Sequence, residues 1–290
     1  MLMKKCVFVL FLCIVNVVGW AQDSVEPIPL KSMFWGTRLV DAHTTNLLNK
    51  RAFSFEILHR FQTVASGMST MFGVYGSSNI AMGVNYGLLN KFQIGFLSEK
   101  MSKTQEFSCK YSLLQQNIDN SIPVSIAYNG MLSIDGRARE KFGKHYRFTN
   151  RLFYTHQLIV SKQIAYKFNL ATWLSIVHFN KVSPLFQADK FELAMAVGYR
   201  FHRGKSVFIR YMHPWDMHLF EAKKKGVIKP KPGLSIGIET GTSSHKFQVF
   251  FSTRKQLGLA KDLLKSSNSI AFKNLSLGFN MKIDIWKHHK

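Results

Sequence analysis

Apolar and polar residues alternate one by one through much of this chain, and this alternation restricts the fold more than any other feature. In segment 275–285 every second residue is apolar, from Leu275 to Ile285, and the residues between are polar or glycine. Segments 80–88 and 191–201 keep the same period, with small or charged residues between the apolar ones. Side chains alternate between two faces in a strand, whereas a helix needs a period of about 3.6. These segments are therefore predicted to be β-strands.

Runs of this kind number about twelve, and several reach the roughly 9–11 residues that a tilted strand needs to cross a bilayer. They lie near 53–61, 80–88, 92–98, 105–114, 122–134, 150–163, 166–178, 191–201, 206–212, 234–240, 246–252 and 271–285. After Gly19 no segment has 18 consecutive apolar residues, so no later membrane helix is expected.

The connections between these runs are alternately long and short for most of the chain. Long connections are 62–79, 135–149, 179–190, 213–233 and 253–270, and short ones are 89–91, 164–165, 202–205 and 241–245; the pair 99–104 and 115–121 differs little. Outer-membrane barrels have long outer loops, short periplasmic turns and an even strand count. The sequence therefore predicts an all-β fold, a transmembrane antiparallel up-and-down β-barrel of about 12 strands in the outer membrane.

The N-terminal residues have the three parts of an export signal. A short basic start is followed by the apolar run 6–19, and small residues at Gly19 and Ala21 fit a cleavage site before Gln22. We therefore predict a signal peptide at 1–21 and an outer-membrane β-barrel at 51–290. Residues 22–50 alternate poorly, so this segment is predicted to be either a periplasmic lead or a plug in the barrel mouth.

Charged residues fall on the less apolar face of the predicted strands, which is the face expected to line the lumen. Glutamates and basic residues are nearly balanced there, and a mixed-sign interior favours cross-barrel ion pairs and a narrow lumen over a wide anion pore. The predicted lumen charge network is Glu56, Arg60, Glu106, Lys110, Glu192, Arg200, Arg210, Glu239 and Lys246, with Lys282 on the same face.

The formal net charge of +23 lies largely in the long connections. Because export argues against nucleic acid as a partner, we expect membrane lipid, and in particular outer-leaflet phosphates, to be the counter-charge. The residues predicted to contact these phosphates are Arg137, Arg139, Lys223, Lys224 and Lys225, and segment 253–270 is expected to add Arg254, Lys255, Lys261 and Lys265. Solvated loops with incidental charge are the alternative.

No catalytic or metal-binding motif is recognisable in the chain. It has no H-E-x-x-H, G-x-S-x-G, phosphate loop or paired C-x-x-C, so we expect no enzymatic activity, no cofactor and no metal. Cleavage of the signal would leave Cys109 as the one thiol, on the face of Phe107 and Tyr111, where a buried inert side chain is expected.

Several phrases together resemble an uncharacterised outer-membrane β-barrel family of Bacteroidetes, a domain of unknown function. They are FWGTRLVDAHTTNLL (34–48), FSFEILHRF (53–61), FGVYGSSNIAMGVNYGL (72–88), KYSLLQQ (110–116) with PVS (123–125), RLFYTHQLIVSKQI (151–164), VHFNKV (177–182), GIETG (237–241) and LGFNMK (277–282). The resemblance covers nearly the whole mature chain and implies barrel architecture and a membrane location. It implies no substrate, cofactor or catalytic residue.

Function follows from the fold only in outline. The favoured interpretation is a porin-like barrel that serves as a narrow channel or as a scaffold for a periplasmic protein partner. The alternatives are a barrel enzyme acting on outer-membrane lipids and a soluble periplasmic β-protein that binds an acidic ligand.

Overall fold

The structure of the protein is a computed structural model that describes residues 34, 36–220, 222–265 and 267–285. The predicted signal peptide, 1–21, and the first part of segment 22–50 lie outside the described residues.

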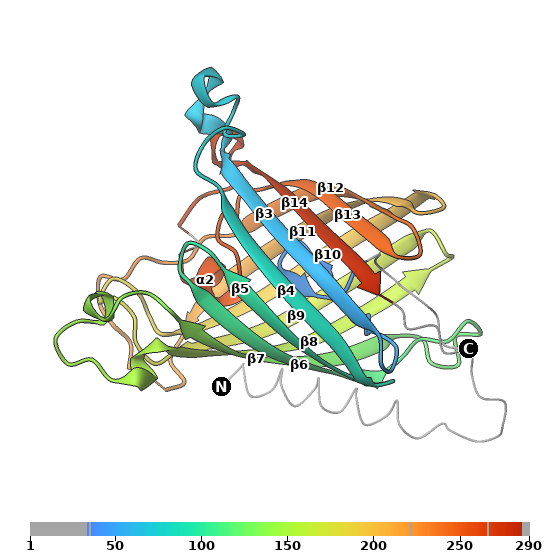
Figure 1. Cartoon of the computed structure of the whole chain (residues 1–290), viewed down its shortest axis with the longest axis horizontal. Coiled ribbons are helices and arrows are strands. Elements are labelled where there is room, and N and C mark those ends of the chain that lie inside the picture. The colour runs from blue at the N-terminus through green and yellow to red at the C-terminus, as the bar shows by residue number, and fades with distance from the viewer. Residues whose placement is uncertain (1–33, 35, 221, 266, 286–290) are drawn as a thin grey trace.

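Twelve antiparallel strands close into one barrel in which each strand pairs with its neighbours in sequence, and β14 pairs with β3 to complete the cylinder (Figure 1). The predicted fold class is thus confirmed. The strands are β3 (Phe53–Thr63), β4 (Asn79–Leu89), β5 (Phe92–Glu99), β6 (Thr104–Leu114), β7 (Ser125–Asp135), β8 (Leu152–Ile164), β9 (Phe168–Phe179), β10 (Asp189–His202), β11 (Lys205–Met217), β12 (Gly233–Gly241), β13 (His245–Ser252) and β14 (Ser276–Ile285).

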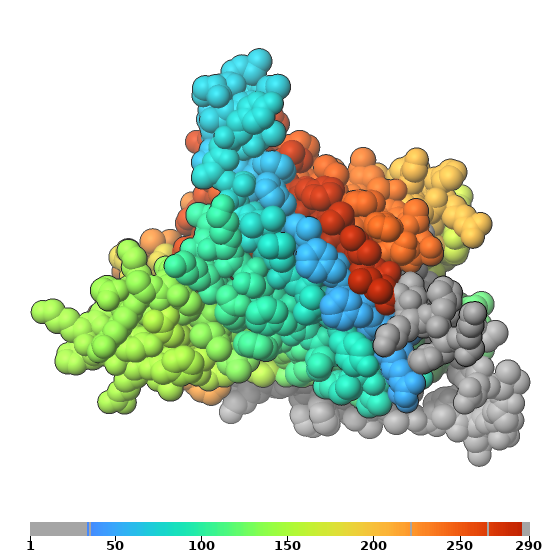
Figure 2. All heavy atoms as spheres, viewed as in Figure 1, coloured from blue at the N-terminus to red at the C-terminus, as the bar shows by residue number. Residues whose placement is uncertain are grey.

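The two ends of the barrel differ in the length of their connections. One end, called the short-turn end, carries 90–91, 115–124, 165–167, 203–204 and 242–244. The opposite, long-loop end carries 64–78, 100–103, 136–151, 180–188, 218–232 and 253–275. Figure 1 and the space-filling view in Figure 2 show 64–78 and 136–151 projecting well beyond the barrel wall. In outer-membrane barrels the long-loop end faces the cell exterior.

Short helical turns are confined to the connections. They are η1 (Val64–Ser66), η2 (Met68–Thr70), η3 (Arg139–Phe142), η4 (Phe148–Arg151), η5 (Phe272–Asn274) and the α-helix α2 (Leu259–Leu264). Among the described residues, no helix is long and apolar enough to span a membrane.

Exposure along each strand follows the alternation in the sequence, with apolar side chains outside and polar or small ones inside. In β10, Met195 and Val197 are 53% and 43% exposed, whereas Glu192 is 1% exposed. This arrangement is the reverse of a water-soluble protein and is the one a membrane barrel requires, since lipid solvates the outer face. Cys109, expected to be buried, lies exposed on this outer face.

The largest differences from the sequence prediction concern two strand boundaries and one connection. β11 continues past 212 to Met217 and includes Pro214, because beyond Met212 it pairs with β10 alone and an edge position tolerates the missing N–H. β14 begins at Ser276 and not near 271, since η5 precedes it. The connection 253–270 is not an extended outer loop, because it carries α2 into the barrel.

A charge on the outer face tests the assignment of that face to lipid. Phe279 lies on β14 beside Phe247, with their ring centroids 6.1 Å apart. We expect Phe279→Arg to reduce the folding free energy by about 2–4 kcal/mol if the position is near the bilayer midplane. Phe279→Leu should have a small effect. Folding titrations into lipid vesicles measure both, and equal losses would contradict the assignment.

Candidate functional site

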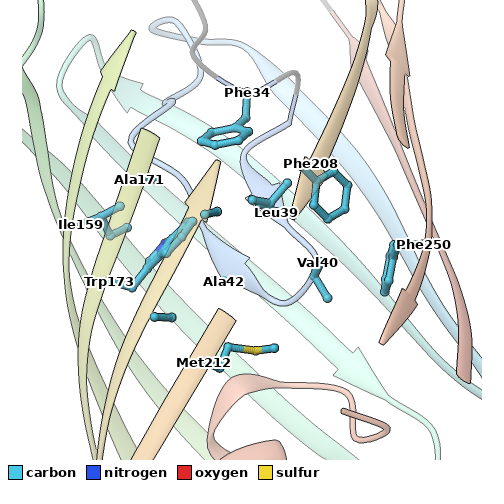
Figure 3. Packing of buried hydrophobic residues seen from close by; sticks show 12 residues of the cluster. Phe34, Leu39, Val40, Ala42, Ile159, Ala171, Trp173, Phe208, Met212 and Phe250 are labelled. Carbon is cyan, nitrogen blue, oxygen red and sulfur yellow. The ribbon is translucent and has the colours of Figure 1, made fainter. Parts of the chain in front are cut away.

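Residues 36–48, together with Phe34, form a segment that lies inside the barrel; we call it the N-terminal insert. Its centre is a small hairpin of β1 (Arg38–Leu39) and β2 (Ala42–His43). Figure 3 shows Phe34, Leu39 and Val40 lying among side chains of the surrounding wall. The sequence left the location of this segment open.

One side of the N-terminal insert is apolar. Phe34, Leu39, Val40 and Ala42 form a buried cluster with wall residues of β8 to β11 and β13. The wall residues of this cluster are Ile159, Ala171, Trp173, Ala194, Ala196, Phe208, Met212 and Phe250. The indole Nε1 of Trp173 also donates a hydrogen bond of 2.6 Å to the carbonyl oxygen of His43. This side is packed like a protein core.

The opposite side of the insert is polar and charged. The Arg38 guanidinium bridges two wall carboxylates, with Nε 3.0 Å from Glu56 Oε1 and Nη2 3.0 Å from Glu106 Oε1. Asp41 of the insert pairs in turn with a cation of the wall, because its Oδ1 lies 2.6 Å from Nη2 of Arg60. Burying any one of these ions without its partner would be costly, so the insert and this wall depend on each other for charge balance.

Backbone groups of the insert complete the polar side. Lys110 Nζ donates to the carbonyl oxygens of Thr37, Thr44 and Asn46, at 3.5, 3.2 and 2.5 Å. The three acceptors match the three N–H donors of this buried ammonium group. The wall thus contacts the main chain of the insert as well as the side chains of Arg38 and Asp41.

The turn of the small hairpin is strained. Val40 has φ +57°, which is unusual for a β-branched residue. Wall amides hold the turn in place: Gln248 Oε1 accepts a hydrogen bond of 3.1 Å from Val40 N, and Asn280 Nδ2 donates one of 2.8 Å to Val40 O. A strained backbone conformation of this kind persists only where surrounding contacts hold it in place.

A second insert enters from the long-loop end. Residues 254–265 fold into the barrel, and every residue of α2 is buried. Leu259 and Leu263 pack against Phe153, Val177 and Phe179 of the wall.

Charged residues anchor this second insert to the wall. Arg254 Nη2 lies 3.4 Å from Glu192 Oε2, and its Nη1 lies 3.1 Å from Asp262 Oδ2, while Lys261 forms an ion pair with Asp135. Arg254 and Lys261 were expected in an outer loop, and that expectation is wrong: they are 3% and 6% exposed, inside the barrel.

All nine residues of the predicted lumen network lie on the inner face. Eight are buried, and Lys246, at the short-turn end, is half-buried and pairs with Asp284. Their nearest partners differ from the expected wall-to-wall pairs. Glu192 and Arg210 come together at 3.6 Å, but Glu56, Glu106 and Arg60 take partners from the N-terminal insert.

Two members of the network have other neighbours. Glu239 accepts hydrogen bonds from Gln248 Nε2 at 2.7 Å and from Ser206 Oγ at 3.4 Å. The Arg200 guanidinium lies 4.4 Å from the ring centroid of Tyr166, near the short-turn end.

The residues predicted to contact outer-leaflet phosphates lie at the long-loop end. Arg137 is hydrogen-bonded to Asp135, and the Arg139 guanidinium lies 5.2 Å from the ring centroid of Tyr146. Lys223 and Lys225 are exposed, and Lys224 Nζ donates to the carbonyl oxygen of Phe186 at 3.3 Å. Their contact with phosphate stays a prediction.

Burial and neighbouring charges shift the pKa values of three ionisable groups in the two inserts. Burial opposes the charge of Arg38, but Glu56 and Glu106 outweigh it and raise the pKa of the guanidinium. Burial, helped by Arg38 and Lys110, lowers the pKa of His43 well below its usual value, so this imidazole is neutral. Burial raises the pKa of Asp262 to about 7 although Arg254 opposes the shift.

Two small cavities flank the Arg38 bridge. One, of about 20 Å³, is lined by Arg38 and Glu56 and extends toward Lys246 and Lys282 at the short-turn end. The other, of about 10 Å³, is lined by Glu106 and by Lys261 at the long-loop end. A water molecule needs about 10–15 Å³ of such volume, so each cavity has room for about one. Arg38 lines the first cavity, and its partner Glu106 lines the second.

No group of three or more His, Cys, Asp and Glu residues within the described part of the chain is placed to hold a metal ion. The inner charges are instead committed to one another and to the inserts.

Comparison with known proteins agrees with the barrel architecture. A family model described as a membrane-bound beta barrel domain (DUF5777) matches residues 34–284. No curated protein sequence matches the chain. Among solved structures, the COG4313 outer membrane channel from Pseudomonas putida F1 is 14% identical, with a TM-score of 0.53 over 85% of this chain and 100% of that one. The NanC porin is 8% identical, with a TM-score of 0.50 over 80% and 99%. These two structures share the fold.

The raised pKa of Asp262 predicts that the second insert responds to pH. In the folded protein this carboxyl keeps a proton that the unfolded chain releases near its ordinary pKa of 3.8. The contribution of this carboxyl to the free energy of unfolding is therefore complete at low pH and is lost as the pH rises through about 7. We expect amide hydrogen exchange in 259–264, corrected for intrinsic rates, to be faster at pH 8.5 than at pH 5.5. Asp262→Asn should remove the difference, and an unchanged pH dependence in that variant would exclude Asp262 as its source.

Proposed function

The chain belongs to the family of the membrane-bound beta barrel domain (DUF5777), an outer-membrane β-barrel family, and we propose that it is a narrow channel that its own N-terminal insert closes at rest. The observation that carries the proposal is the Arg38 bridge between Glu56 and Glu106, with a cavity on each side of it.

One cavity lies beside the polar side of the N-terminal insert, and the other lies between Glu106 and the second insert. The cavity beside Glu106 shares Phe153 and Lys261 with a larger pocket that opens at the long-loop end. The cavity beside Glu56 reaches Lys246 at the short-turn end. The two linings combine charged residues with Leu58, Leu97 and Leu257, and the Arg38 bridge connects Glu56 of the first lining with Glu106 of the second.

The asymmetry of the insert supports a movable closure. Its apolar side is packed against β8 to β11, where displacement would expose core-like surface to water. Its polar side is held by ion pairs and hydrogen bonds, which water can replace at far lower cost.

Conductance across a planar bilayer tests the proposal. The wild-type protein should conduct poorly at low voltage. Arg38→Ala removes the bridge and leaves Glu56 and Glu106 without their cation, so the polar side should hydrate and the single-channel conductance should rise severalfold. Arg38→Lys keeps a cation at the bridge and should conduct nearly as poorly as the wild type.

Two outcomes would contradict the closed channel. Large, stable currents from the unmodified protein would mean that the insert does not close the lumen. The other outcome is an Arg38→Ala variant that folds correctly, as shown by heat-modifiable migration on a gel, and still gives only background current at every voltage. In that case a scaffold for a periplasmic protein partner would be the better proposal.

Two other functions were considered from the sequence, a soluble periplasmic protein and an enzyme that acts on lipids. A soluble periplasmic protein is wrong, because the chain belongs to a membrane-bound barrel family and exposes large apolar side chains around its outer face. A lipid-acting enzyme would need a nucleophile beside a histidine at the lipid-facing rim. On the outer face His156 Nδ1 lies 2.5 Å from the Tyr128 hydroxyl, and His213 Nδ1 lies 3.0 Å from the Tyr211 hydroxyl. At the short-turn end the Ser244 hydroxyl lies 2.9 Å from His245 Nδ1. The absence of enzymatic activity stays a prediction.

A further inference from the structure

A large pocket lies at the long-loop end, outside the plugged part of the lumen. It is enclosed by the 136–151 connection, the 180–188 connection and α2, and its volume is about 510 Å³. Pockets for small organic molecules range from about 300 to 1,000 Å³. The pocket is thus large enough for a molecule of one or two rings.

The walls of this outer pocket are strongly basic. Asp135 is its one acidic lining residue, and its basic lining residues are Arg137, Lys141, Arg151, Lys181, Lys261 and Lys265. Asp135 is already neutralised, since it accepts hydrogen bonds from Arg137 Nε at 2.9 Å and Nη2 at 2.7 Å and pairs with Lys261. Within the described residues, Lys141, Lys181 and Lys265 form no ion pair. The pocket therefore has positive charge that the protein does not balance.

Arg151 is held in place by other groups of the protein. Its Nη1 donates to the carbonyl oxygens of Asp135 and Arg137, each at 2.6 Å, and its Nε donates to the Tyr146 hydroxyl at 2.6 Å. The guanidinium also lies 4.8 Å from the ring centroid of Phe142. Nη2 makes no hydrogen bond to the described part of the chain. A donor fixed before the ligand arrives costs little entropy on binding.

Aromatic rings form another part of the lining. Phe153 and Phe179 stack with their centroids 4.8 Å apart at an interplanar angle of 20°, and Lys261 Nζ lies 5.0 Å from the Phe153 centroid. Phe142 and Phe186 also line the pocket. Phe153 and Phe179 are each 3% exposed, so the accessible apolar lining is offered by Val182, Pro184 and Phe186. A bare inorganic anion would leave this apolar surface unused, whereas a ring that carries anionic groups would cover it and meet the cations.

We infer that the outer pocket is a binding site for a small organic polyanion, a ring-sized body bearing two or more carboxylate or phosphate groups. Nη2 of Arg151 and the ammonium groups of Lys141, Lys181 and Lys265 contact the anionic groups, and Phe186 with Val182 and Pro184 contacts the body. Both a dissolved solute and the phosphorylated sugar headgroup of an outer-leaflet lipid have this chemistry. The inference is independent of whether the barrel conducts.

Calorimetric titration of the purified full chain in a neutral detergent tests the site without a membrane. Benzene-1,3,5-tricarboxylate is the probe, and it should bind saturably with one site per chain and more weakly as salt is added. The uncharged benzene-1,3,5-trimethanol should give no binding. Absence of saturable binding by the tricarboxylate at low ionic strength would overturn the inference.

Matched variants separate the pocket from the overall positive charge. Lys141→Gln, Lys181→Gln and Lys265→Gln together remove three exposed cations that no carboxylate needs, so the fold should persist, and affinity should fall by about tenfold or more. The control combines Lys100→Gln, Lys229→Gln and Lys273→Gln, which are exposed, lie at the same end and do not line the pocket. Equal losses in the two variants would attribute binding to net charge and refute the site.

Competition identifies the source of the ligand. Displacement of the probe by glucose 1,6-bisphosphate would indicate a dissolved solute. Displacement by a diphosphorylated glucosamine lipid in mixed micelles, but not by the sugar bisphosphate, would indicate a lipid headgroup. Failure of the Arg38 conductance test would leave these binding results intact, so the two proposals can fail separately.

Discussion

The inward charges of the closed barrel have to be neutralised inside it, and the rest of the structure depends on how this is done. Glu56 and Glu106 lie on a wall that offers them no closer cation than Arg38 of the N-terminal insert. Arg60 on the same wall finds its carboxylate in Asp41 of that insert. Because an unpaired buried ion costs several kcal/mol, wall and insert form one electrostatic unit. The insert therefore completes the charge balance of this side of the lumen.

The strands and the inner face were predictable because they follow from a local rule. Alternation of period two assigns each residue to a face, and it placed Glu56, Arg210 and the other network residues inside without any knowledge of their partners. The partners were not predictable, since Arg38 and Asp41 belong to a segment that does not alternate, and its pairing with the wall is a tertiary contact across many residues. No local rule connects position 38 with position 106.

The 254–265 insert shows a second way in which local patterns mislead. Its basic residues suggested an outer loop, because most basic residues are exposed. The contrary signal was the spacing of Leu259 and Leu263, four residues apart, which gives one turn of helix an apolar face. That face packs on Val177 and Phe179, and Arg254 and Lys261 follow it inside because Glu192 and Asp135 are there to receive them. A charged residue in a loop is thus informative only together with the apolar residues beside it.

The outer pocket and the cavity beside Glu106 in the lumen share Lys261, and this shared residue links them physically. Lys261 lines both the pocket and the small cavity beside Glu106, and it pairs with Asp135. Any anion in the pocket competes with Asp135 for this ammonium group and for Arg137. Suppose that the protein can hold α2 in two positions and that the anion binds one of these conformations more tightly. By linkage, the anion then shifts the equilibrium toward that position of α2. The same ion pair that anchors the second insert is therefore the place where the occupancy of the pocket and the packing of the lumen act on each other.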